Sequence, residues 1–159
     1  MVISPPMSRG LRPSAAVTLP DQGRVLRAFG DEVVVHLSGE QTGGTLALCT
    51  LVSPPGGGPP VHYHTHEDES FLLQEGRVSF FLDGQWTEVP VGTTVFVPRT
   101  VVHSYKNHGD RPSRMLLTAS PSGFEKFFAR CADEFNKSGG PNIDRLVQIA
   151  GEHGIRFVD

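Results

Sequence analysis

Residues 56–76 read GGGPPVHYHTHEDESFLLQEG, and this stretch holds the most informative side chains of the chain. His62 and His64 are two residues apart, so on an extended segment their imidazoles point to the same face. Glu69 follows five residues after His64, and His103 lies downstream in another apolar run. Imidazole and carboxylate groups together bind divalent first-row transition metals. Three imidazole nitrogens and one carboxylate would leave coordination positions of the metal open. The pattern therefore predicts a metal site with a chemical role, not a structural one.

The composition predicts one soluble globular domain. The chain has 159 residues, of which 38% are hydrophobic and 19% charged. A net charge of −3 without a basic stripe argues against a nucleic-acid partner. Cys49 and Cys131 are far apart and outside any CxxC motif, which predicts reduced thiols and a cytoplasmic protein. Residues 1–14 lack the apolar core of a secretory signal, and no apolar run is long enough to span a membrane.

The middle of the chain alternates between short β-prone segments and turn signals. We expect strands at residues 32–37, 45–52, 70–74, 77–82, 86–89, 93–97, 101–105 and 114–118. Asp83-Gly84 is a strong hairpin signal. The Gly/Pro-rich loop at residues 53–60 leads directly to His62. Many short strands with regular turns predict an all-β sandwich or barrel.

After residue 120 the hydrophobic period becomes helical. One helix is expected around residues 124–135, with Ser122 and Glu125 forming a capping box at its start. A second helix is expected around residues 143–150, ended by Gly151 or Gly154, with a final strand at 155–158. We therefore predict a mobile tail at residues 1–14, a β-barrel at 15–120 and a helical cover at 121–159.

The spacing in two segments resembles the signature motifs of the cupin superfamily. Residues 56–76 resemble the first motif, and residues 92–107 resemble the second. The matching positions are Gly56, His62, His64, Glu69 and Gly76, followed by Gly92, Pro98, His103 and Asn107. One position departs, because the glycine usual two residues after the proline is Thr100 here. We therefore expect a different backbone conformation in the turn after Pro98.

The resemblance implies a cupin fold, which is a double-stranded β-helix or jelly-roll barrel, with short C-terminal helices packed on it. It also implies a metal site inside the barrel, with His62, His64 and Glu69 from one hairpin and His103 from a facing strand. His66 alternates with His64 as well, but its spacing fits the motif less well, so we expect it at the rim. We expect Glu67 and Asp68 to lie in a solvated turn. We expect Tyr105 to be a core residue, with a contact to the substrate as the alternative.

Within the superfamily, residues 59–71 and 123–128 resemble small single-domain proteins related to quercetin 2,3-dioxygenase. This implies a dioxygenase-type oxidoreductase that acts on an enol, hydroxy-ketone or aromatic small molecule, with Glu69 as ligand and catalytic base. The metal stays open among iron, manganese, nickel, cobalt, copper and zinc. Two alternatives stay open: a non-oxidative isomerase, cyclase or lyase, and a cupin that binds a small ligand without catalysis. The resemblance also implies a homodimer.

Overall fold

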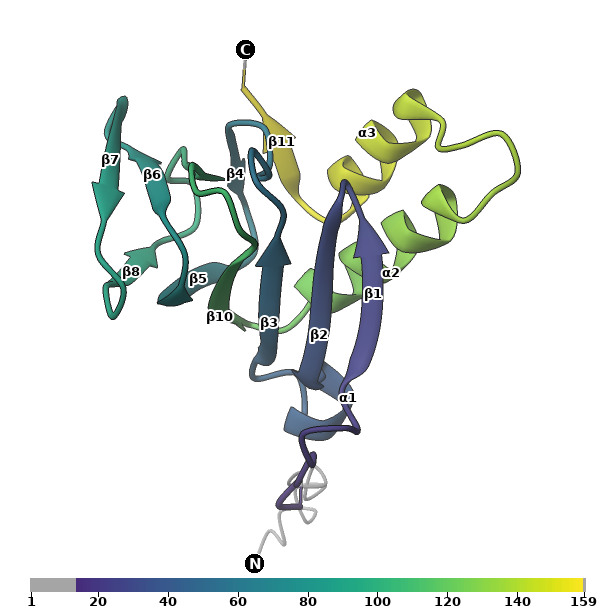
Figure 1. The fold of residues 1–159 in the computed structure, drawn as a ribbon. Coiled ribbons are helices and arrows are strands. Elements are labelled where there is room, and N and C mark those ends of the chain that lie inside the picture. The colour runs from purple at the N-terminus through teal and green to yellow at the C-terminus, as the bar shows by residue number, and fades with distance from the viewer. Residues whose placement is uncertain (1–13, 159) are drawn as a thin grey trace, which may run out of the picture.

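The computed structural model describes residues 14–158, which form antiparallel sheets with helices on one side (Figure 1). The largest sheet has six strands, in the order β1 (Arg24–Ala28), β2 (Asp31–Leu37), β3 (Ala47–Ser53), β10 (Ser113–Ser120), β5 (Asp68–Glu75) and β8 (Thr94–Val97). A three-stranded sheet has the order β7 (Gln85–Val89), β6 (Val78–Leu82) and β9 (Ser104–Asn107). The third sheet pairs β11 (Ile155–Phe157) with β4 (His62–His64).

The core follows from the period-two alternation of the central strands. In β10, Met115, Leu117 and Ala119 are buried, and the residues between them are more exposed. Leu117 lies opposite Cys49 of β3 on one side and Phe71 of β5 on the other. Apolar side chains from both larger sheets and from the C-terminal helices join in this cluster. The inner surface of this core also carries the candidate site.

The predicted all-β architecture is confirmed, but hydrogen bonding does not close its strands into a continuous barrel. β4 has only three residues and pairs with β11 alone among the named strands. Its other backbone links are an isolated bridge between His62 and His103 and a hydrogen bond from the Thr100 N–H to the His64 carbonyl oxygen. Pro59 and Pro60 precede β4, and proline has no N–H to extend a ladder in that direction. The expected hairpin that joins His62 and His64 to Glu69 is therefore wrong, because β5 pairs with β8 and β10.

Most predicted strands are present, with three differences. β1 and the short helix α1 (Gly39–Thr42) were not predicted, and β9 begins at Ser104, later than the expected strand at 101–105. β1 is an edge strand with only two buried residues, so its sequence carries a weak alternation signal. The Asp83-Gly84 hairpin is confirmed, and both residues have positive φ, as a tight two-residue turn requires.

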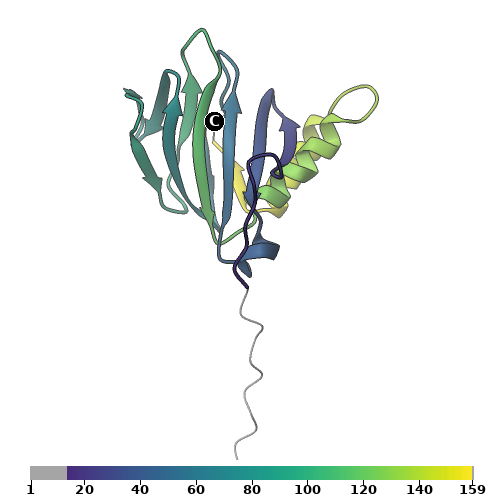
Figure 2. The same ribbon diagram turned by 60° about the horizontal axis from the view of Figure 1, so that its bottom comes forward.

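Helices α2 (Phe124–Phe135) and α3 (Ile143–Glu152) lie beside β1 and β2, on the side away from β7 (Figure 2). The expected capping box of Ser122 and Glu125 is wrong, because the N-cap of α2 is Gly123. The Glu125 carboxylate instead accepts hydrogen bonds from the backbone N–H groups of Gly123 and Gly39, both at 2.9 Å. This buried carboxylate ties α2 to α1, across 86 residues of sequence.

The division into tail, barrel and helical cover stays a prediction, and residues 1–13 of the tail lie outside the described residues. The final strand is present as β11, and it pairs with β4 of the proposed barrel. No helix within residues 14–158 combines the length and the hydrophobicity that crossing a membrane requires.

Candidate metal centre

Four side chains converge on one buried point. His62 and His64 project from β4, Glu69 from β5, and His103 from the residue before β9. One ligand atom from each lies within 4.8 Å of the ligand atoms of the others, and all four residues are buried. Sequence spacing predicted this set, and the structure brings all four together. His66 is exposed and outside the cluster, as expected for a rim residue.

Hydrogen bonds at the outer nitrogens determine which way the imidazoles face. Nδ1 of His62 lies 2.8 Å from the Pro60 carbonyl oxygen, and Nδ1 of His103 lies 2.9 Å from the Val101 carbonyl oxygen. A carbonyl oxygen can only accept, so each Nδ1 carries the proton and donates. Nε2 of each ring therefore points into the cluster, and an unprotonated Nε2 is the form of imidazole that binds a metal.

The inner atoms form a donor set that fits a cation. Nε2 of His62 lies 3.2 Å from Nε2 of His64, and Oε2 of Glu69 lies 2.9 Å from Nε2 of His103 and 3.3 Å from Nε2 of His64. Lone pairs that face one another at such distances repel unless a proton or a metal ion lies between them. A buried set of three imidazoles and one carboxylate is thus compatible with a divalent metal.

Burial and neighbouring charges shift the pKa values of three residues of the cluster, and for His62 and Glu69 the shift favours the form that binds metal. Burial lowers the pKa of His62 to about 4, and repulsion from His103 and His64 adds to this effect. Burial opposes the charged form of His64 as well, but the carboxylates of Glu69 and Glu67 outweigh it and raise that pKa. Burial acts to raise the pKa of Glu69, yet the adjacent imidazoles lower it overall. Glu69 is therefore ionised and His62 neutral near pH 7.

Glu67 is a site residue that sequence reasoning missed. It was expected in a solvated turn, but it is buried, and its Oε2 lies 3.1 Å from Nδ1 of His64. A carboxylate that accepts from the outer nitrogen of a ligating imidazole orients the ring and makes it a stronger ligand. The spacing His64-x-x-Glu67 was the available signal. Asp68 lies at the surface instead, where it pairs with Arg99 at 3.0 Å.

The turn after Pro98 supports the strand that carries the ligands. The Thr100 N–H donates to the His64 carbonyl oxygen at 2.6 Å, and His62 and His103 exchange backbone hydrogen bonds of 3.0 and 2.8 Å. The expectation of a different backbone conformation at Thr100 is wrong, because its φ is 71°. That is the left-handed region that favours glycine, so a β-branched residue is strained there. The contact to His64 keeps the turn in this conformation.

An apolar cavity of about 110 Å³ adjoins the cluster. Its walls carry aromatic rings from the β1–β2 turn, β5, β9, α2 and β11. The lining aromatic residues are Phe29, Phe71, Tyr105, Phe124, Phe127, Phe128 and Phe157. The β1–β2 turn puts Phe29 at positive φ, with its ring edge-on to Phe128 and Phe135 of α2. The arrangement puts the candidate ligands at the wall of an apolar space, where charges interact more strongly than in bulk water.

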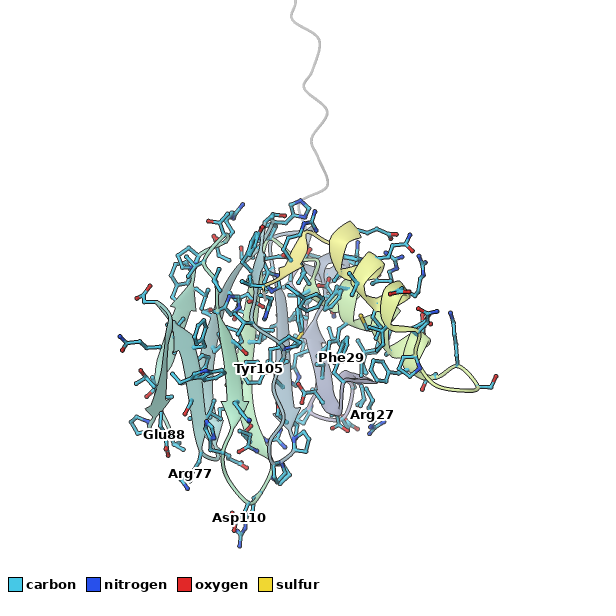
Figure 3. All side chains as sticks on the ribbon, turned by 90° about the horizontal axis from the view of Figure 1, so that it is seen from above. Arg27, Phe29, Arg77, Glu88, Tyr105 and Asp110 are labelled. Atoms are coloured by element: carbon cyan, nitrogen blue, oxygen red, sulfur yellow. The ribbon has the colours of Figure 1, made fainter. Side chains whose placement is uncertain are left out.

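Tyr105 is buried, as expected for a core residue, and it also lines the cavity. Figure 3 labels it together with Phe29, another lining residue. Its hydroxyl donates to Oδ2 of Asp31 at 3.2 Å. Asp31, at the start of β2, is a second residue that sequence reasoning missed. No local motif marks it, because its partner lies 74 residues away in the chain.

Comparison with known proteins agrees with this geometry. The cupin domain family matches residues 50–119. Quercetin 2,3-dioxygenase of Bacillus subtilis is 29% identical over 115 residues, which cover 69% of this chain and 34% of the relative. The polyketide synthase CurC of Streptomyces cyaneus is 30% identical over 96 residues, which cover 60% of this chain and 62% of that protein. The chain thus spans less than two thirds of the length of either relative.

A predicted oxalate decarboxylase of Thermotoga maritima has the same fold, with a TM-score of 0.59 and 22% identity. The match covers 67% of this chain and 99% of the decarboxylase. Residues 50–119 thus match a cupin domain, and the relatives and the fold agree with that match. The names of its relatives differ in reaction class, so the family by itself supports an enzyme of unspecified reaction.

Proposed function

We propose that this protein is a metal-dependent cupin enzyme of the dioxygenase type, acting on a small aromatic or enolic molecule. The observation that carries the proposal is the orientation of the imidazoles. Two of the three histidines give their Nδ1 protons to backbone carbonyls, and His64 faces a carboxylate with its Nδ1. All three Nε2 atoms therefore face Glu69 at the edge of an apolar cavity.

His62, His64, Glu69 and His103 would hold the metal. A bound metal would supply Lewis acidity, and redox chemistry if it is a redox-active ion. The side chains of the protein would bind the substrate, exclude water and accept a proton. The aromatic walls bind an apolar ring and exclude water, and Glu69, ionised in its buried position, accepts a proton from a substrate hydroxyl.

The cavity volume narrows the substrate class. An apolar protein cavity of roughly 150 Å³ binds benzene, and the cavity here measures about 110 Å³. We propose a one-ring substrate, or a larger substrate that inserts one ring. Hydroxylated aromatic rings suit both parts of the site, because the ring packs on the aromatic walls and a hydroxyl oxygen can bind the metal.

The test compares turnover with and without oxygen. Protein reconstituted separately with iron, manganese, nickel, cobalt, copper and zinc would be supplied with quercetin and with catechol, a one-ring enediol. Oxygen uptake together with loss of substrate supports the dioxygenase. Turnover that persists anaerobically would refute it and favour a non-oxidative isomerase, cyclase or lyase. Binding without turnover under every metal would favour a ligand-binding cupin.

A further inference from the structure

The exposure of the lining residues locates the entrance of the cavity. Among the described residues that line it, only Phe29, Pro60 and Phe157 are exposed, and Phe29 and Phe157 are each 41% exposed. An opening to solvent has to be bordered by exposed residues, so the entrance lies among these three. The Phe157 ring lies 6.5 Å from the His62 ring, which puts Phe157 on the metal side of the entrance. The aromatic neighbours of Phe29 are instead in α2.

Phe29 occupies a backbone position that disfavours phenylalanine. Phe29 and Gly30 form the two-residue turn between β1 and β2, with φ of 57° and 82°. The turn of Asp83 and Gly84 has the same form, with φ of 51° and 78°. A left-handed φ is rare for a bulky residue, whereas Asn, Asp and Gly are preferred in such turns. The second turn follows this preference, and the first keeps an aromatic ring against it.

The Phe29 ring lies at the boundary between the cavity and α2. Its centroid is 6.2 Å from that of Phe128, which lines the cavity, and 5.0 Å from that of Phe135, which does not. Packing against Phe135 is the competing explanation for the ring, because that contact requires no cavity. Helix packing alone does not account for the place of Phe29 in the lining at the entrance.

We propose that Phe29 is a specificity-determining residue, whose ring closes the entrance side of the cavity beside α2 and limits the ligand to one aromatic ring. Phe157 borders the entrance on the metal side, so a ligand with its oxygen at the metal centre would meet Phe29 with its other end. A second fused ring would have to displace Phe29 or stay in water. The inference rests on the proposed function, because it puts the ligand in this cavity.

Two phenols that differ by one fused ring test this limit. Zinc-loaded protein would be titrated calorimetrically with phenol and with 2-naphthol, and the ratio of the two affinities is the readout. Phe29→Asn suits the left-handed turn and removes the ring. We expect it to raise the ratio of 2-naphthol to phenol affinity about tenfold, as burial of roughly 50 Å² more apolar surface provides. Phe29→Tyr keeps the ring, and Phe135→Asn makes the same change outside the lining, so both should keep the ratio.

Each contrary result identifies what fails. An unchanged ratio in Phe29→Asn overturns the role of Phe29, and Phe29→Leu provides the same test if Phe29→Asn does not fold. An equal rise in Phe135→Asn assigns the effect to helix packing and also overturns the proposal. If neither phenol binds fully zinc-loaded protein, the cavity is not the ligand site, and the role of Phe29 fails with it. If zinc does not bind, the proposed function fails, and the same titrations of metal-free protein decide the role of Phe29 alone.

Discussion

Oε2 of Glu67 lies 3.1 Å from Nδ1 of His64, on the side of the ring that faces away from the candidate metal. This contact orients His64, because within residues 14–158 no backbone carbonyl accepts from its Nδ1 as those of Pro60 and Val101 do for the other two imidazoles. Glu67→Gln keeps the side chain's size but removes its charge. We expect metal affinity to fall about 10- to 100-fold, measured by competition with a chelator.

The control for Glu67→Gln is His66→Ala, which changes the exposed neighbour. Its metal affinity should match that of the unchanged protein. Equal affinities for all three proteins would show that Glu67 has no positioning role.

The ligand assignment predicts a sharp contrast among the histidines. His62→Ala, His64→Ala and His103→Ala should each lose bound metal, because each removes an inward-facing Nε2. Elemental analysis of folded protein measures the loss, and circular dichroism confirms the fold. Full occupancy in His103→Ala would remove that residue from the ligand set, and loss of metal in His66→Ala would mean that the wrong histidines were paired.

Two adjacent imidazoles should titrate in opposite directions in metal-free protein. Burial lowers the pKa of His62 to about 4, whereas Glu69 and Glu67 raise the pKa of His64 despite its burial. Nuclear magnetic resonance of the ring protons should show His62 titrating below, and His64 above, the ordinary value of about 6.5. Titration of both rings at the same pH would contradict this electrostatic description.

The same shifts have opposite effects on stability. The folded-state pKa of His62 is depressed, so its contribution to stability is present above pH 6.5 and is lost as the pH falls through about 4. The folded-state pKa of His64 is raised, so its contribution is present below its unfolded pKa and is lost as the pH rises through the folded value. Glu67→Gln should lower the pKa of His64 and weaken the second effect, which urea unfolding at several pH values would measure.

Thr100→Gly tests the strain in the turn below His64. A left-handed conformation costs a β-branched residue about 1–2 kcal/mol, and the added freedom of glycine in the unfolded chain offsets up to about 1 kcal/mol of that. We expect the free energy of unfolding to rise by about 0.5–1 kcal/mol. Thr94→Gly, in strand β8 without a positive φ, should lower it by a similar amount. Destabilisation by both variants would show that Thr100 is not strained.

Much of the site is already present in the local sequence. The strand period puts His62 and His64 on one face, and the residue types specify a metal donor set. The two motifs therefore predicted all four converging residues, and the periodicity predicted most strands and both longer helices. The homodimer, the cytoplasmic location and the absence of nucleic-acid and membrane partners stay predictions.

Contacts between distant segments decided the rest. β11 rather than β5 pairs with β4, and the Asp31 carboxylate meets the Tyr105 hydroxyl across the core. Thr100 keeps a glycine-like conformation because its N–H is bonded to the His64 carbonyl. Local sequence specifies which face a side chain occupies, since that depends on backbone geometry alone. Only the folded chain specifies what lies opposite that face, and here the opposing groups orient the imidazoles.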